Sequence, residues 1–215
     1  MNRIIPIAGA LAAALGSMLT LAPAKAATCT FGVPTATCVA GWSTILGDKT
    51  FTIVTAPDTG SGILDWSVEA LAWKVETIWD DNDLLGAAQG SFSYIAEITS
   101  GSANFYDIGL SSEGFEGPQS AGDNVVTKTI AADAQGNTVL ATLTSTNGGD
   151  SNVVLPSGYT KLYITDQWDV PAGNELNGIV NYHTQRVPGP LPVLGAVAAL
   201  GFSRRMRRRL SEVNV

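Results

Sequence analysis

Residues 90–98 read Gly-Ser-Phe-Ser-Tyr-Ile-Ala-Glu-Ile, and Phe92, Tyr94, Ala96 and Ile98 occupy every second position. A period of two is typical of a β-strand with one buried face and one face in water. Aromatic and β-branched side chains also favour strands over helices. This stretch therefore predicts a strand near the centre of a β-rich domain.

Similar runs recur on both sides of it, at 49–55, 138–144 and 161–168. Clusters of Gly, Pro, Asn and Asp, which favour turns, separate the runs. They lie at 56–60, 100–101, 116–118, 135–137, 147–150 and 171–174. About eight to ten short strands with such breaks predict a mostly β fold, a single antiparallel β-sandwich of jelly-roll-like form. We expect it to span residues 27–187.

Residues 67–79 fit two patterns at once. Their apolar side chains can be placed at helical spacing, as in an amphipathic helix packed on the sheet. Alternate residues are also apolar or β-branched, which favours a strand. We favour the strand because strands are expected on both sides; the alternating residues are Leu71, Trp73, Val75, Thr77 and Trp79.

The predicted domain is acidic. Residues 27–187 hold 5 basic and 18 acidic residues, hence a net charge of −13. Such a domain repels phosphates, so nucleic acid is excluded as a partner, whereas cation binding is compatible with it.

Two cysteines, Cys29 and Cys38, lie close together near the start of this domain. In an exported chain this spacing predicts one local disulfide. Two unpaired thiols are the alternative. A metal site is less favoured, because structural zinc needs four ligands and His183, the only histidine, is far away in the sequence.

The N-terminus has the anatomy of a secretory signal peptide over residues 1–26. Arg3 gives a positive start, residues 4–22 carry no charge, and Ala24 and Ala26 are small residues at the positions that signal peptidase reads. We expect Sec-type export and cleavage after Ala26 or Ala27. The alternative is an uncleaved transmembrane anchor.

The C-terminal segment, 188–215, has three parts. A proline-rich stretch comes first, an uncharged run over 193–202 follows, and arginines close it. Arginines after an apolar run stay in the cytoplasm, which leaves the preceding domain outside. Residues 191–202 would form only about 18 Å of helix against about 30 Å of hydrocarbon, which suits a temporary stop better than a permanent anchor. The arginines are Arg204, Arg205, Arg207, Arg208 and Arg209.

This segment resembles the sorting signal of PEP-CTERM proteins, in its cyanobacterial-type Val-Pro-x-Pro-Leu-Pro variant. The matching residues are Val187, Pro188, Gly189, Pro190, Leu191 and Pro192. The resemblance implies an exosortase-type membrane protease as partner, a transient inner-membrane stage, and release to the cell surface or extracellular matrix. Gly189 replaces the glutamate of the Pro-Glu-Pro form.

Residues for catalysis or metal binding are few in the sequence. His183, beside Val180 and Tyr182, is expected at the surface or at a strand edge and not in a catalytic triad. Acidic residues are plentiful, but nothing pairs two of them as a glycoside hydrolase requires. Asp80, Asp81 and Asp83 could hold calcium or form a solvated turn, and no other cofactor is indicated.

Five tryptophans raise the question of sugar stacking. In a small β-sandwich, tryptophans more often belong to the hydrophobic core than to a surface that stacks on sugars. We therefore expect core positions for Trp42, Trp66, Trp73, Trp79 and Trp168.

The sequence thus predicts an exported surface or matrix protein that is structural or adhesive and not an enzyme. The alternative is a carbohydrate-binding module for extracellular polysaccharide. A glycoside hydrolase that uses two carboxylates is less favoured.

Overall fold

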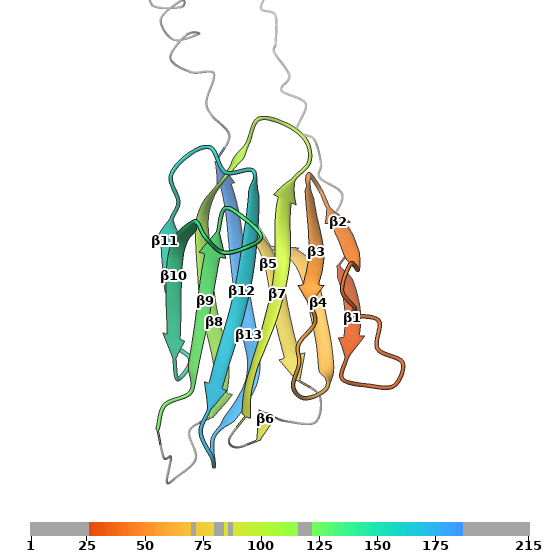
Figure 1. The fold of residues 1–215 in the computed structure, drawn as a ribbon, viewed down its shortest axis with the longest axis vertical. Coiled ribbons are helices and arrows are strands. Elements are labelled where there is room, and N and C mark those ends of the chain that lie inside the picture. Colours follow the sequence, from red (N-terminus) through yellow and green to blue (C-terminus); the bar gives the residue numbers. More distant parts are fainter. Residues whose placement is uncertain (1–25, 70–71, 80–83, 86–87, 116–121, 187–215) are drawn as a thin grey trace, which may run out of the picture.

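The computed structural model describes residues 26–69, 72–79, 84–85, 88–115 and 122–186. Within these ranges the chain forms strands and no helix, and the strands make two antiparallel sheets that face each other (Figure 1). The predicted mostly β sandwich is therefore confirmed, while its jelly-roll form stays a prediction.

The first sheet has the order β1-β4-β5-β13-β8-β11, with the short β6 pairing with β13. β13 is central and pairs with β5 on one side and β8 on the other. The strands are β1 (Ala27–Phe31), β4 (Gly62–Glu69), β5 (Ala72–Trp79), β6 (Leu84–Leu85), β8 (Asn104–Phe115), β11 (Ser151–Val154) and β13 (Glu175–Arg186).

The second sheet has the order β10-β9-β12-β7-β3-β2. β12 pairs with β7 over ten residues and with β9 over seven, so the middle of this sheet is its most extensively paired part. The strands are β2 (Ser43–Leu46), β3 (Lys49–Thr55), β7 (Ala88–Ile98), β9 (Val125–Ala131), β10 (Val139–Thr146) and β12 (Lys161–Val170).

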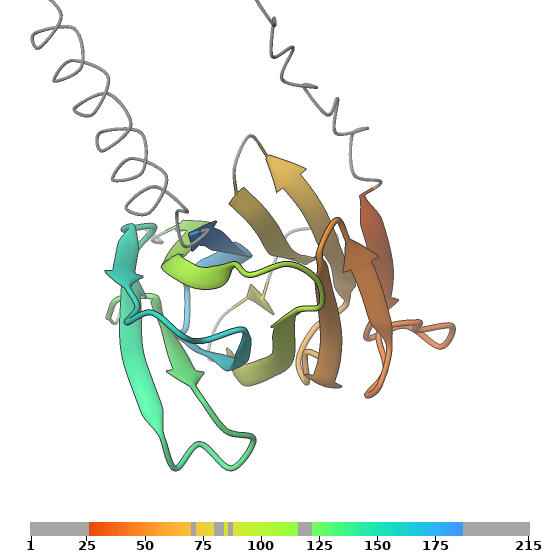
Figure 2. The same cartoon turned by 90° about the horizontal axis from the view of Figure 1, so that it is seen from above.

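The core lies between the two layers, which Figure 2 shows from above with β1–β3 at one side and β9–β11 at the other. Phe92, Tyr94 and Ala96 of β7 are fully buried, as their alternation predicted. Phe51, Phe105 and other apolar side chains from both sheets join them in one continuous cluster. Burial of this apolar surface is the main force that holds the layers together.

The described parts of the ambiguous segment, 67–69 and 72–79, are extended. β4 ends at Glu69, β5 begins at Ala72, and the two strands pair in an antiparallel ladder. Val75, Thr77 and Trp79 are buried between the sheets, so the strand prediction, with its alternation, is confirmed.

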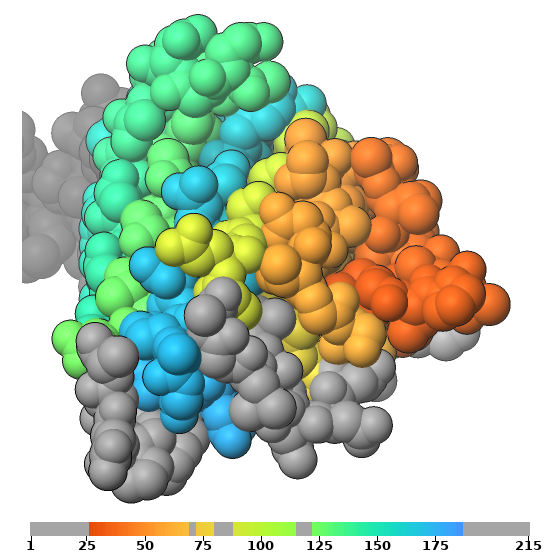
Figure 3. Space-filling model, turned by 60° about the horizontal axis from the view of Figure 1, so that its bottom comes forward, coloured from red at the N-terminus to blue at the C-terminus, as the bar shows by residue number. Residues whose placement is uncertain are grey.

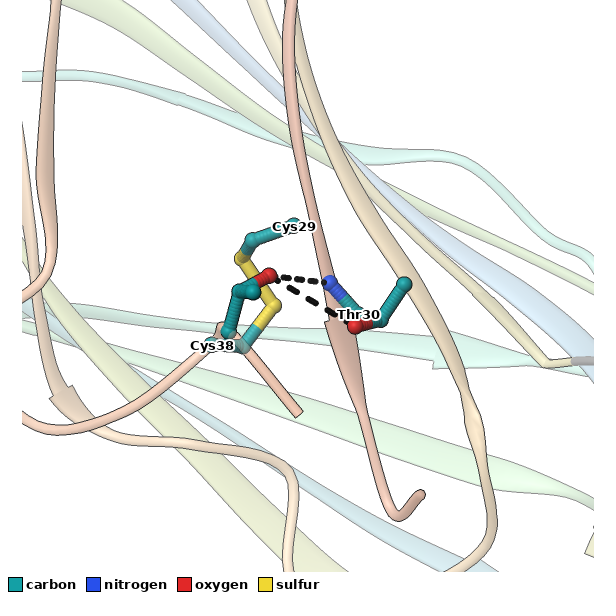
Figure 4. Close-up of a disulfide and its surroundings, with 4 residues drawn as sticks. Cys29, Thr30 and Cys38 are labelled. Atoms are coloured by element: carbon teal, nitrogen blue, oxygen red, sulfur yellow. Dashed lines mark hydrogen bonds between the residues drawn. A yellow bond between two sulfur atoms is a disulfide. The ribbon is translucent and has the colours of Figure 1, made fainter. Parts of the chain in front are cut away.

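The predicted disulfide is present. Cys29 of β1 bonds to Cys38 with an S–S distance of 1.99 Å, and both residues are buried. Beside the bridge the Thr30 amide donates to Thr37 Oγ1 at 3.0 Å (Figure 4). The loop between the cysteines projects from one side of the sandwich, as the orange lobe of Figure 3 shows.

Two expectations about burial were wrong. His183 is fully buried and not at the surface, because β13 is the central strand of its sheet and odd-numbered residues near its end face inward. Val139 is 51% exposed, although the alternation of 138–144 places Val139, Ala141 and Leu143 on one apolar face that is expected in the core. The pairing of β10 with β9 is irregular between Val139 and Ala141, which breaks the alternation there.

The predicted export and sorting signals lie almost wholly outside the described residues. This applies to residues 1–25, including Ala24, to 187–215, and to the acidic cluster of Asp80, Asp81 and Asp83. Ala26 precedes β1, and Ala27 is its first residue. In the described part of the chain, no helix is long and apolar enough to cross a membrane.

Candidate functional site

A hollow of about 310 Å³ lies on the outer face of the first sheet, over β8, β11 and β13. It is formed mostly by polar side chains of paired strands, and Asp150 comes from the turn before β11. The volume is at the lower end of the range for ligand sites, about 300–1,000 Å³. Its lining residues are Asp107, Gly109, Leu110, Ser111, Asp150, Ser151, Asn152, Tyr182 and Thr184.

A β-bulge in β8 shapes one end of the hollow. Ile108 pairs with His183 and Phe105 with Gln185, so that Tyr106 and Asp107 together face Thr184. The Asp107 amide donates to Thr184 Oγ1 at 3.1 Å, which fixes the bulge. Bulges redirect side chains, and they are frequent beside functional sites.

The bulge leaves the Asp107 carboxylate next to β11. There Asn152 donates its Nδ2 proton to Asp107 Oδ1 at 3.3 Å. Asn152 itself is exposed and pairs in register with Gly109. Carboxylate and amide groups are thus held side by side at the rim, where they can accept and donate hydrogen bonds to a ligand.

Tyr182 supplies the aromatic surface of the hollow. It lies on β13 between Lys74 of β5 and Gly109 of β8, and it is half-buried. A Cβ atom at Gly109 would lie 3.5 Å from Tyr182 Cβ and 3.6 Å from its Cδ2. Since glycine has no side chain, one flank of the tyrosine stays uncovered.

The charge of the hollow restricts what it can bind. Two carboxylates, Asp107 and Asp150, line it, and none of its lining residues is basic. The neighbouring Lys74 forms an ion pair with Glu76 at 2.9 Å. Anionic ligands are therefore disfavoured, and a neutral molecule with many hydroxyl groups fits the lining best.

The tryptophans do not form a sugar-stacking platform. Trp66, Trp79 and Trp168 are buried, and Trp42 and Trp73 pack against the core. The indole Nε1 groups of Trp79 and Trp168 donate to Thr59, at 3.2 Å in each case. The prediction of core positions is confirmed for Trp66, Trp79 and Trp168, whereas Trp42 and Trp73 are only partly buried.

His183 lies inside the sandwich, not in the hollow. Its Nε2 and the Tyr94 hydroxyl are 3.1 Å apart, and its Nδ1 lies 3.4 Å from the Trp73 carbonyl oxygen. Burial, reinforced by the positive charge of Lys128, lowers the pKa of His183 from 6.5 to about 3. The ring is therefore neutral at ordinary pH and links the two sheets.

The described residues contain no cluster of three or more His, Cys, Asp or Glu side chains suited to a metal ion. Asp80, Asp81 and Asp83, the calcium candidates of the sequence, lie outside these residues. The calcium site therefore stays a prediction.

No protein-family model matches the chain, and no curated protein does. Among solved structures, it is similar to a family 61 carbohydrate-binding module in complex with β-1,4-galactotriose. The identity is 13% and the TM-score 0.33, and the match covers 56% of this chain and 74% of that one.

A second similar structure is a family 29 carbohydrate-binding module mutant in complex with mannohexaose. Here the identity is 11% and the TM-score 0.28, with 77% of this chain and 94% of the other covered. Such scores are too low to establish a shared fold, so they decide nothing about the ligand of this chain.

The sequence did not single out the hollow as a site. In the sequence Tyr182 stands out only as an apolar neighbour of His183, and no motif marks Asp107 or Asn152. Only the alternation along the strand points to the site. Tyr182 and Thr184 alternate with the buried residues of β13, so they belong to the outer face of the sheet. Pairing of β13 with β8, and of β8 with β11, brings the residues together.

Proposed function

We propose that the protein is an exported, non-catalytic surface protein whose sandwich binds a neutral polysaccharide in the hollow over β8, β11 and β13. The observation that supports this is the lining itself: the uncovered flank of Tyr182 beside Asp107, Asn152 and Ser111. Sugars present apolar ring faces and hydroxyl groups together, and this surface complements both.

The rigidity of the site also favours binding. Tyr182 lies on the central strand of its sheet, and the bulge at Asp107 is fixed by Thr184. A site formed by paired strands loses little conformational entropy when a ligand arrives. The ligand would lie across the strands, because the lining residues come from three neighbouring strands.

Export is supported by separate observations. The two ends of the sequence have the pattern of a signal peptide and of a sorting signal, and the Cys29–Cys38 disulfide suits an oxidising compartment. An adhesive role, in which the released domain attaches to matrix polysaccharide, combines both parts of the proposal. Exosortase processing is part of it.

Calorimetry and a glycan array with neutral and anionic oligosaccharides test the binding. We expect neutral oligosaccharides to bind and to remain intact after incubation. The substitution Tyr182→Ala should lower affinity at least about tenfold, or about 1.4 kcal/mol, because it removes the only aromatic ring of the lining.

Tyr163→Ala is the matched control. Tyr163 is also a half-buried tyrosine, but it lies on β12 of the opposite sheet, and Lys161 Nζ is 5.8 Å from its ring centroid. This variant should bind like the unmodified protein. Absence of glycan binding would overturn the binding proposal and leave a purely structural role. Cleavage of the oligosaccharides would support the hydrolase alternative.

A further inference from the structure

We propose that Lys128 and Asn181 form an intramolecular amide cross-link between the two sheets, with Asp166 as the proton carrier. A lysine, a carboxylate and a carboxamide lie in contact in the core. Lys128 Nζ donates to Asp166 Oδ1 at 2.8 Å, and Asn181 Nδ2 donates to Asp166 Oδ2 at 2.7 Å. All three residues are 0% exposed.

The three side chains come from both layers. Lys128 of β9 pairs in register with Asp166 of β12 in the second sheet, whereas Asn181 belongs to β13 of the first. The two oxygens of one carboxylate hold the lysine nitrogen and the amide group next to each other. Such fixed proximity replaces an encounter between separate molecules and thereby lowers the barrier to reaction.

The surroundings make the Lys128 ammonium easier to deprotonate. Lys128 Nζ lies 5.7 Å from the centroid of the Tyr94 ring, which is itself fully buried. Burial lowers the pKa of the Lys128 ammonium, against the opposing effect of Asp166. A buried ion pair is costly to keep, and a desolvated lysine is a good nucleophile once it loses its proton.

Asn181 has one further anomaly. Its Oδ1 atom is buried and lacks a hydrogen-bond partner in the described structure. An unpaired buried carbonyl destabilises the folded state. A protonated Asp166 could donate to this oxygen if the amide turns over, and this contact would also polarise the Asn181 Cγ for attack.

The reaction balances without any other reagent. Lys128 transfers one proton to Asp166, and its neutral Nζ forms a bond to Asn181 Cγ. The Cγ–Nδ2 bond then breaks, one of the two remaining Nζ protons moves to the departing nitrogen, and one ammonia molecule leaves, while the other proton stays on the new amide. The products are the Lys128–Asn181 amide and a protonated Asp166. The reaction thus removes both charges of the buried pair.

Peptide mapping of the exported full chain tests the cross-link. Trypsin should fail to cleave after Lys128, and residues 75–161 should be recovered joined to 162–186, lighter by one ammonia. Fragmentation should place the junction at positions 128 and 181. The substitutions Lys128→Met and Asp166→Asn should each abolish the joined peptide, and Asn181→Asp should give it with loss of water instead.

Peptide mapping of the unmodified chain tests the cross-link even where a variant fails to fold. Cleavage after Lys128 with separate peptides of unchanged mass would overturn the proposal. A junction at Asp166 with loss of water would also overturn it. Neither result bears on polysaccharide binding, because the hollow lies on the opposite side of β13 from Asn181.

Discussion

At the scale of single residues, His183 is held neutral between the sheets, and its titration links pH to stability. In the unfolded chain it binds a proton below about pH 6.5, whereas burial lowers its pKa to about 3 in the folded protein. The unfolded state therefore gains protons first, so stability falls as the pH drops from about 6.5 towards 3. Through this residue alone, the free energy of unfolding should fall by up to about 1.4 kcal/mol for each pH unit.

Urea unfolding of the unmodified protein and of His183→Gln, at several pH values, measures this effect. The advantage of the unmodified protein should shrink as the pH falls through this window. A ring-proton NMR titration of His183 provides a second measurement that needs no variant. Parallel stability curves, or a titration near pH 6.5, would contradict the buried neutral histidine.

Gly109 is the residue whose small size keeps the hollow open. A valine there would place its methyl groups over the Tyr182 flank, while its Cβ makes only ordinary contacts of 3.5 Å or more. We expect Gly109→Val to keep the melting temperature nearly unchanged and to lower glycan affinity more than tenfold, or about 1.4 kcal/mol. Unchanged affinity in this variant would place the ligand elsewhere.

At the scale of elements, the disulfide ties β1 to the loop that follows it. The bridge spans a sequence separation of 9, so its removal should lower the free energy of unfolding by about 2.6 kcal/mol according to the loop-entropy relation. The double variant Cys29→Ala, Cys38→Ala avoids unpaired thiols and should show this loss in urea unfolding.

Thr37→Val is the control for this measurement. It keeps the disulfide and removes the hydrogen bond from the Thr30 amide, which is worth about 1 kcal/mol. A double-cysteine variant that loses no more stability than Thr37→Val would show that the bridge hardly constrains the unfolded chain.

The bulge in β8 shows how one element can serve both the core and the surface. Alternation alone would bury every second residue, but the extra residue at Tyr106 and Asp107 shifts the phase, so that Phe105 and Ile108 are both buried. The carboxylate of Asp107 is thereby turned towards the hollow. A strand pattern read from sequence gives no warning of such a shift.

At the scale of the whole molecule, the two ends of the sequence carry the prediction about its cellular route. In a host with an exosortase, the mature chain should begin at Ala27 or Thr28 and should lack the arginine cluster of 204–209. Terminal sequencing of the surface-released protein by mass spectrometry measures both ends. In a host without an exosortase, the C-terminal segment should remain.

Replacement of the five arginines by glutamine should weaken retention of the tail in the membrane, because the charges that stop its transfer are lost. Recovery of the chain from the cytosol with both termini intact would contradict the export proposal.

The sequence by itself determined the class of fold and most of the core. Alternation in 90–98 and 161–168 decides which face of each strand is apolar, and this property is local. Turn residues between the runs limit strand length, and the nearness of Cys29 to Cys38 made their bridge predictable. The predictions of signals at the two ends likewise rest on the sequence alone.

Only the tertiary structure decided which faces meet. A period of two in the sequence assigns each side chain to one face of its strand, but it does not indicate which other strands pair with that strand. The burial of His183, the meeting of Lys128, Asp166 and Asn181, and the hollow beside Tyr182 all follow from the central place of β13. Pairings between distant segments depend on the free energy of the whole sandwich, so no local stretch of sequence specifies them.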